Sequence, residues 1–177
     1  MSETRKKTLL YKLTDANGQT YNHTQWDEGV THETSGEGEL CGPGWIHAYT
    51  SPLLAVFLNP IHGRFKNPQL WECIGEGLEK SDYGLKVGRT RITTVKRIPL
   101  PVVTTNQRIA FSILAVLEVY KEPSFVLWTN NWLSGKDRTA ADAEAVVRSA
   151  WSVAADAAVA GSVLDLQSLA EKALTYS

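Results

Sequence analysis

The sequence lacks any long apolar run. None of its 177 residues belongs to a stretch that approaches the roughly 20 apolar residues a membrane-spanning helix needs. The first ten residues, MSETRKKTLL, carry basic side chains without the apolar block that follows them in a secretion signal. We therefore expect a soluble protein of the cytoplasm with no membrane partner.

The sequence also lacks an excess of charge of either sign. Eighteen Lys and Arg residues stand against 19 Asp and Glu residues, a formal charge of −1, so no overall field draws the chain to nucleic acid. Residues 86–97, KVGRTRITTVKR, hold five cations and no acid and could contact phosphate groups. Since a solvated strand face explains the same run, nucleic acid is not the expected partner.

Cysteine is scarce. Cys41 and Cys73 are expected to stay reduced in a cytosol and to serve as small buried apolar side chains. The histidines and Cys41 lack the short paired spacing of metal motifs, so no metal site is expected: these histidines are His23, His32, His47 and His62.

The common catalytic templates are missing as well. The chain has no P-loop, no Gly-x-Gly-x-x-Gly after a strand, no Gly-x-Ser-x-Gly elbow and no His-Glu-x-x-His. These absences leave open whether the protein is an enzyme.

What the first hundred residues do contain is typical of strands. Residues 8–13 are β-prone and precede Asn17-Gly18, a strong hairpin signal, and residues 23–44 have the composition of a long surface loop. Ser51 and Pro52 predict the start of a helix that Asn59-Pro60 should end. Further strands are expected over residues 45–49, 69–77 and 91–98.

From residue 104 the pattern becomes helical. Thr104 and Gln107 have the spacing of a capping box before an apolar run. A second helix is expected from Pro123 to Gly135, with an alanine-rich helix over residues 136–161 and a last helix behind Asp165.

Strands first and helices last favour an α+β fold. We expect a twisted, mostly antiparallel sheet over residues 8–100, covered by a C-terminal helical layer. Residues 1–103 would form the β-rich half and residues 104–177 the helical layer of the same domain.

Several short pieces of this chain resemble an uncharacterised domain found in bacteriophages and bacteria. The pieces span about residues 8–100 and are Cys41, GWIHA, Pro52-Leu53, LWECIGEG, Lys86 and RITTVKRI. The segment WTNNWLSGKDRTAADAEAVV is similar to the alanine-rich ends of phage reading frames. The resemblance implies a phage-type viral protein in the host cytoplasm, and it implies no activity.

A second set of residues resembles the layout of ADP-ribosyltransferases. Lys12 stands where that family grips NAD, Tyr49 and Ser51 stand in the middle motif, and Glu72 or Glu76 takes the place of the late glutamate. The resemblance implies NAD as cofactor and these residues as the catalytic set. A helix cap at Ser51 and a solvent-facing strand explain the same residues without catalysis.

Our leading interpretation is a binding protein that acts on a host protein or on a small anionic ligand such as a nucleotide. The expected site lies where the 23–44 loop meets the strand at 45–49. Its residues are Trp45, His47, Tyr49, Lys12, Arg89 and Arg91, the last two as anion contacts.

Two further interpretations concern surfaces. Trp26, Trp128 and Trp132 could anchor a protein partner, although such residues are commonly core. Alternatively, the protein is a virion or assembly component whose alanine-rich helix forms a homo-oligomer interface.

Overall fold

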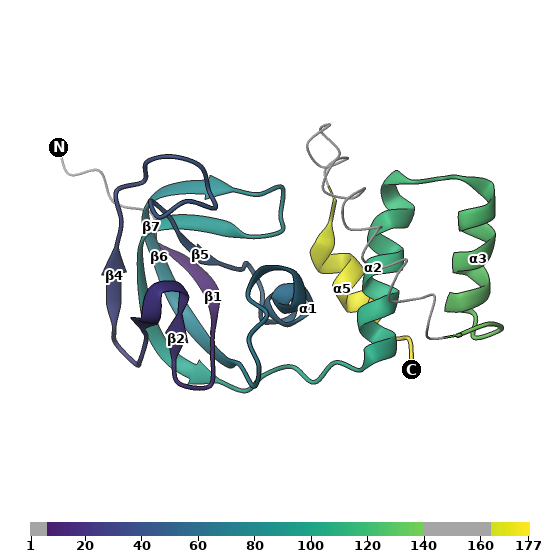
Figure 1. The fold of residues 1–177 in the computed structure, drawn as a ribbon, viewed down its shortest axis with the longest axis horizontal. Helices are drawn as coiled ribbons and strands as arrows, with labels where there is room; N and C mark the ends of the chain where they lie inside the picture. The colour runs from purple at the N-terminus through teal and green to yellow at the C-terminus, as the bar shows by residue number, and fades with distance from the viewer. Residues whose placement is uncertain (1–6, 140–163) are drawn as a thin grey trace. The chain divides into compact units, whose positions relative to one another are not determined.

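The computed structural model describes residues 7–139 and 164–177 (Figure 1). Two compact units divide the chain, Met1–Pro101 and Val102–Ser177. The first holds the sheet and one helix, and the second is helical, which confirms the α+β class. That the helices cover the sheet stays a prediction.

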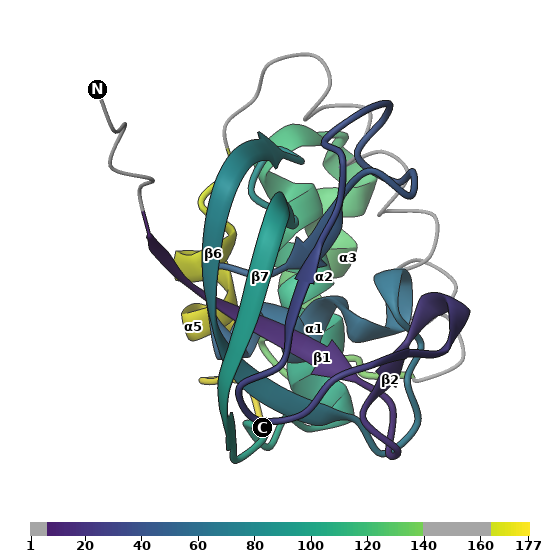
Figure 2. The same ribbon diagram turned by 90° about the vertical axis from the view of Figure 1, so that its left-hand side faces the viewer.

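The first unit is built on an antiparallel sheet. Its strands pair in the order β1-β6-β7-β4, β5 also pairs with β7, and β2 and β3 form a separate pair (Figure 2). All the pairings of named strands in the described residues are antiparallel, as expected. The strands are β1 Thr8–Thr14, β2 Gln19–Thr20, β3 Thr24–Gln25, β4 Thr31–Glu33, β5 Ile46–Ala48, β6 Gln69–Ser81 and β7 Val87–Ile98.

One residue beyond β5, the chain meets the free edge of β1. Tyr49 and Tyr11 exchange two backbone hydrogen bonds of 2.8 Å. Because β1 pairs with β6, β6 with β7 and β7 with β5, this bridge completes a hydrogen-bonded circuit of four strands. One face of each strand therefore turns toward a shared interior, as in a small barrel.

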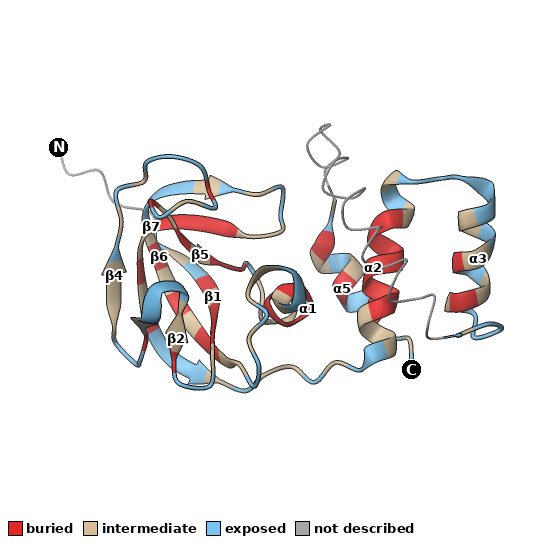
Figure 3. Cartoon of the chain, viewed as in Figure 1, coloured by how far each residue is buried: buried red, intermediate tan, exposed pale blue. Residues whose placement is uncertain are grey.

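That interior is a hydrophobic core (Figure 3). Two tryptophans fill much of it, and both satisfy their indole N–H: Trp26 donates to Thr20 Oγ1 at 2.9 Å and Trp71 to Thr14 Oγ1 at 3.1 Å. Trp26 therefore belongs to the core and is no surface anchor. The cluster comprises Leu10, Trp26, Ile46, Ala48, Trp71, Cys73, Val87 and Ile92.

The predicted N-terminal hairpin is wrong in its pairing. The turn forms, and Gly18 takes the left-handed φ of 77° that such a turn requires, but β1 pairs over its whole length with β6 and β2 pairs with β3. A local turn signal carries no information about a partner strand 60 residues further along the chain. The predicted loop 23–44 likewise contains two short strands, β3 and β4.

Helix α1, Pro52–His62, begins as predicted and ends later than predicted. The Ser51 hydroxyl accepts a hydrogen bond from Leu54 N at 3.1 Å, with Pro52 in the first turn. Asn59-Pro60 does not end the helix, because Pro60 lies in its last turn and lacks only its own N–H. The backbone N–H groups of Gly63 and Arg64 then close the turn on the Asn59 carbonyl.

The second unit contains α2 Thr105–Val119, α3 Pro123–Leu133 and α5 Leu166–Ala173. The capping box at Thr104 and Gln107 is present, and Asp165 caps α5 by accepting from Ser168 N. Trp132 is buried in this unit, and the Arg138 guanidinium lies 5.2 Å from the centroid of its ring. The predicted alanine-rich helix falls largely on residues 140–163, outside the described residues.

Candidate functional site

Lys12 lies in the interior of the first unit, with only 5% of its surface exposed. Its Nζ donates to the His47 carbonyl at 2.9 Å and lies 4.5 Å from the centroid of the Trp26 ring. Burial lowers the pKa of Lys12 to about 8, against a smaller raising effect of the Cys73 thiol. The structure thus brings two predicted site residues, Lys12 and His47, into direct contact.

The His47 carbonyl makes that contact, whereas the His47 side chain points away from the core. Neighbouring residues of a strand alternate between its two faces. Ile46 and Ala48 are buried, whereas His47 is half-buried and bonds through Nε2 to the Leu40 carbonyl. Trp45, also half-buried, donates through Nε1 to the Gly38 carbonyl at 3.2 Å. Both side chains therefore fasten the loop before β5 to the sheet.

Tyr49 pairs with a histidine from helix α1. Its hydroxyl lies 3.2 Å from His62 Nδ1, and the two rings are nearly parallel with centroids 5.9 Å apart. Burial, together with the charges of Lys86 and His47, lowers the pKa of His62 to about 4. Since burial also raises the pKa of Tyr49, Tyr49 donates and a neutral His62 accepts at pH 7.

Lys86, in the turn between β6 and β7, lies close to Asp82 and Cys41. Its side chain is 10% exposed, and its Nζ lies 3.8 Å from Asp82 Oδ2 and 3.2 Å from Cys41 Sγ. Cys41 is exposed, so the expectation of two buried cysteines holds for Cys73 alone; Cys41 lies in a loop with no strand face to bury it. Both thiols are free.

We call Lys12, His47, His62 and Lys86 the basic cluster. Burial lowers the pKa of His47 most, the hydrogen bond with Leu40 raises it, and Lys86 and Lys12 lower it by repulsion. The same repulsion links Lys86 and His47 to His62. Asp82 is the carboxylate that acts against this repulsion at His47, and its Oδ2 lies 3.8 Å from Lys86 Nζ.

The two predicted anion contacts on β7 already hold carboxylates. Arg89 is 4% exposed and binds Glu79, with a further hydrogen bond of 2.6 Å to Thr8 Oγ1. Arg91 lies between Glu33 of β4 and Glu76 of β6, the residues opposite it in register. An external anion would have to displace these acids.

The residues that suggested a transferase are not brought together. Ser51 is occupied as the helix cap. Glu72 pairs with Lys96 at 3.7 Å and Glu76 with Arg91 at 3.3 Å, both on the face of β6 opposite Trp71 and Cys73. Lys12 lies on the inner face beside Cys73, so the sheet itself separates the lysine from both glutamates.

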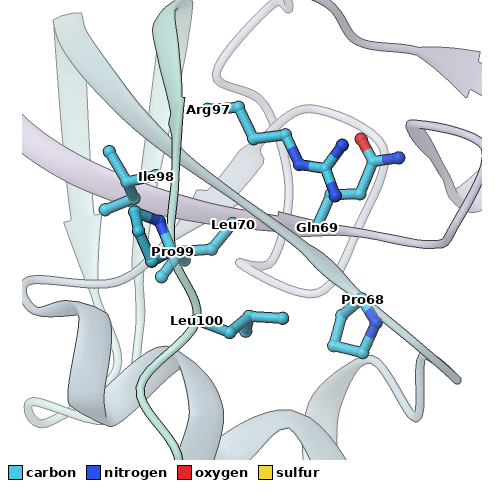
Figure 4. A pocket seen from close by; sticks show the side chains of 7 residues that line it. All are labelled: Pro68, Gln69, Leu70, Arg97, Ile98, Pro99 and Leu100. Atoms are coloured by element: carbon cyan, nitrogen blue, oxygen red, sulfur yellow. The ribbon is translucent and has the colours of Figure 1, made fainter.

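A shallow pocket lies elsewhere in the first unit, where β6 begins and β7 ends (Figure 4). It has a volume of about 370 Å³ and a mostly apolar lining with one cation, Arg97. No member of the basic cluster lines it. The lining residues are Pro68, Gln69, Leu70, Arg97, Ile98, Pro99 and Leu100.

Sequence reasoning missed two members of the basic cluster, His62 and Lys86. His62 lies at the end of a helix that was expected to stop three residues earlier, so its approach to Tyr49 was not foreseen. Lys86 was noted only in a cationic run and among the pieces that resemble the phage domain. The pairing of residues 87–89 with residues 46–48 places Lys86 near the loop before β5, and no local pattern in the sequence indicates this pairing.

The described residues also bear on two other classes of site. No three His, Cys, Asp or Glu side chains among them are arranged to hold a metal ion. No helix within residues 7–139 and 164–177 is long and apolar enough to cross a membrane.

Comparison of the chain with protein-family models, with curated proteins and with solved structures finds no match.

Proposed function

We propose that the protein binds a small anion at the basic cluster. The observation that carries the proposal is the proximity of Lys86 to the two partly buried histidines: its charge lowers the pKa of both His47 and His62, and Asp82, 3.8 Å from Lys86 Nζ, acts against this at His47. An anion placed beside Lys86, His47 and His62 would supply negative charge there, and the partial burial of these groups would strengthen the attraction over its value in water.

The histidines give the cluster a means of responding to its ligand. Both are held below their ordinary pKa by burial and repulsion, so they are mostly neutral at pH 7. A bound dianion reverses the sign of the local field, raises both pKa values and draws protons onto the imidazoles. Binding of a phosphate-type ligand should therefore be coupled to proton uptake and should tighten as the pH falls toward 6.

Phage origin and a host protein as target, which the motifs of residues 8–100 suggested, stay predictions. Of the two partner classes, the geometry favours the small anion because the charge excess is half-buried rather than spread over an exposed surface.

Thermal melting with inorganic phosphate, ADP and NAD as probes tests the proposal. A ligand of the folded state raises the melting temperature in proportion to the logarithm of its concentration, and this rise should shrink in Lys86→Met. Lys96→Met is the matched control, because Lys96 is a cation of β7 that pairs with Glu72 and contacts no member of the basic cluster in the described contacts. No rise with any probe, or an equal rise in Lys86→Met, would contradict the proposal.

A further inference from the structure

Cys41 and Lys86 form a pair of nucleophilic side chains. The Lys86 amine lies 3.2 Å from Cys41 Sγ, in hydrogen-bond contact. The two residues are 45 positions apart in the chain, one in the loop before β5 and the other in the turn between β6 and β7. A bond between them would join two segments that the fold alone brings together.

Both partners are held in place. The Lys86 side chain is 10% exposed, its Nζ faces Asp82, and its carbonyl accepts from Asp82 N at 2.9 Å. On the other side, Gly42 N donates to the Glu39 carbonyl at 2.8 Å, and Lys80 Nζ bonds the Gly38 carbonyl at 3.2 Å and Glu39 Oε2 at 3.3 Å. The loop that carries Cys41 is therefore anchored to the same hairpin that carries Lys86.

From this geometry we propose that Cys41 and Lys86 form a reversible oxidative cross-link, a sulfenamide, when a peroxide oxidises Cys41. In the first step the sulfur of Cys41 attacks hydrogen peroxide; an S–O bond forms, the O–O bond breaks, and a sulfenic acid and water result. The sulfur is oxidised by two electrons and the peroxide is reduced.

The second step joins the side chains without a further oxidant. The unprotonated Lys86 amine attacks the sulfenic sulfur, an S–N bond forms, and the S–O bond breaks. The departing hydroxide combines with the proton that the amine loses, giving water. Asp82 Oδ2, 3.8 Å from Nζ, stands where it can relay that proton.

The other cysteine provides an internal contrast. Cys73 has no exposed surface, and burial raises the pKa of its thiol to about 12. A thiol of this kind reacts slowly with peroxide, whereas Cys41 is open to solvent. Oxidation should therefore select Cys41.

Intact-mass analysis of the full chain, before and after a stoichiometric dose of hydrogen peroxide, tests the link. The wild type and Cys73→Ser should lose the mass of two hydrogen atoms, and digestion should yield one peptide pair joining Cys41 to Lys86. Dithiothreitol should restore the starting mass. Cys41→Ser and Lys86→Arg should not form the linked species.

Three results would overturn the proposal. The first is a wild-type chain that gains only whole oxygen atoms while Lys86 stays unmodified. The second is a linked species that retains the oxygen atom, which contradicts the S–N bond. The third is an equal mass loss in Lys86→Arg, where the guanidinium replaces the amine. The peptide map of the wild type decides the matter even if a variant does not fold.

Discussion

An ammonium group in a protein interior loses its hydration, and hydrogen bonds or opposite charges must replace it. Lys12 has one carbonyl acceptor and one aromatic face for this purpose. The free-energy cost of burying this charged group is reflected in the pKa of Lys12, which burial lowers from 10.5 to about 8. The charge of this residue therefore weakens the fold at neutral pH, and its position is explained better by a role beside His47 than by stability.

The first prediction follows from the sign of that change. Between pH 8 and 10.5 the unfolded chain keeps a proton that the folded chain has released, so the Lys12 contribution to the free energy of unfolding rises with pH. Lys12→Met should be more stable than the wild type at pH 7, by about 1 to 3 kcal/mol, and this advantage should shrink toward pH 10.

Urea denaturation of both proteins over pH 7 to 10 measures the difference. The comparison is needed because the raised pKa of Cys73 acts oppositely: above about pH 9 the unfolded chain releases a thiol proton that the folded chain keeps, and stability falls. A constant difference between the two proteins over this range would show that Lys12 is not titrating in the interior.

The second prediction concerns His62 and the stability of the protein at acid pH. Its folded pKa of about 4 lies below the ordinary 6.5, so the unfolded chain binds the proton first as the pH falls and stability decreases between pH 6.5 and 4. Replacing this histidine by Gln should flatten the pH dependence in that range. His23→Gln, at an exposed position bonded only to Gln19 in the described contacts, should leave it unchanged; equal profiles for both variants would contradict the account.

Among the elements, the cap of α2 offers the third prediction. Thr104 accepts from Gln107 N at 3.2 Å and Gln107 Oε1 accepts from Thr104 N at 2.9 Å. Thr104→Ala removes one half of this reciprocal pair and should lower the free energy of unfolding by about 1 kcal/mol. Thr105→Ala, one residue further and equally exposed, is the control and should change stability by less than about 0.5 kcal/mol.

These elements also show what the sequence could and could not predict. The caps at Ser51, Thr104 and Asp165 were predicted correctly because a cap depends on residues three positions apart. The partner of β1 was missed because strand pairing depends on residues far apart in the chain, and the basic cluster was missed in part for the same reason: four separate segments contribute one residue each.

The outer face of the sheet could be predicted from the sequence in part. Alternation alone placed Glu72 and Glu76 on one face of β6, and the structure confirms it. What alternation could not reveal is that each glutamate already has a cation on the neighbouring strand. Exposed pairs of this kind contribute little to stability, but they remove both carboxylates from the set of free catalytic groups.

At the scale of the whole molecule, the first unit carries its own core and the entire basic cluster. Its buried cluster draws on residues 10–92 alone, and its strand pairings stay within residues 8–98. A chain of residues 1–101 should therefore fold by itself and keep the near-ultraviolet circular dichroism of its buried tryptophans. An unfolded fragment would mean that this unit depends on residues 102–177.

The measurement that tests the central claim most directly is an NMR titration of the histidine side chains with inorganic phosphate at pH 6.5. The chain has four histidines. The account assigns His47 and His62 to the anion site, whereas His23 bonds to the Gln19 side chain and His32 to the Gln25 carbonyl. The imidazole signals of His47 and His62 should move toward the protonated form as phosphate is added, and those of His23 and His32 should stay in place. Four stationary signals, or four that move together, would contradict anion binding at the basic cluster.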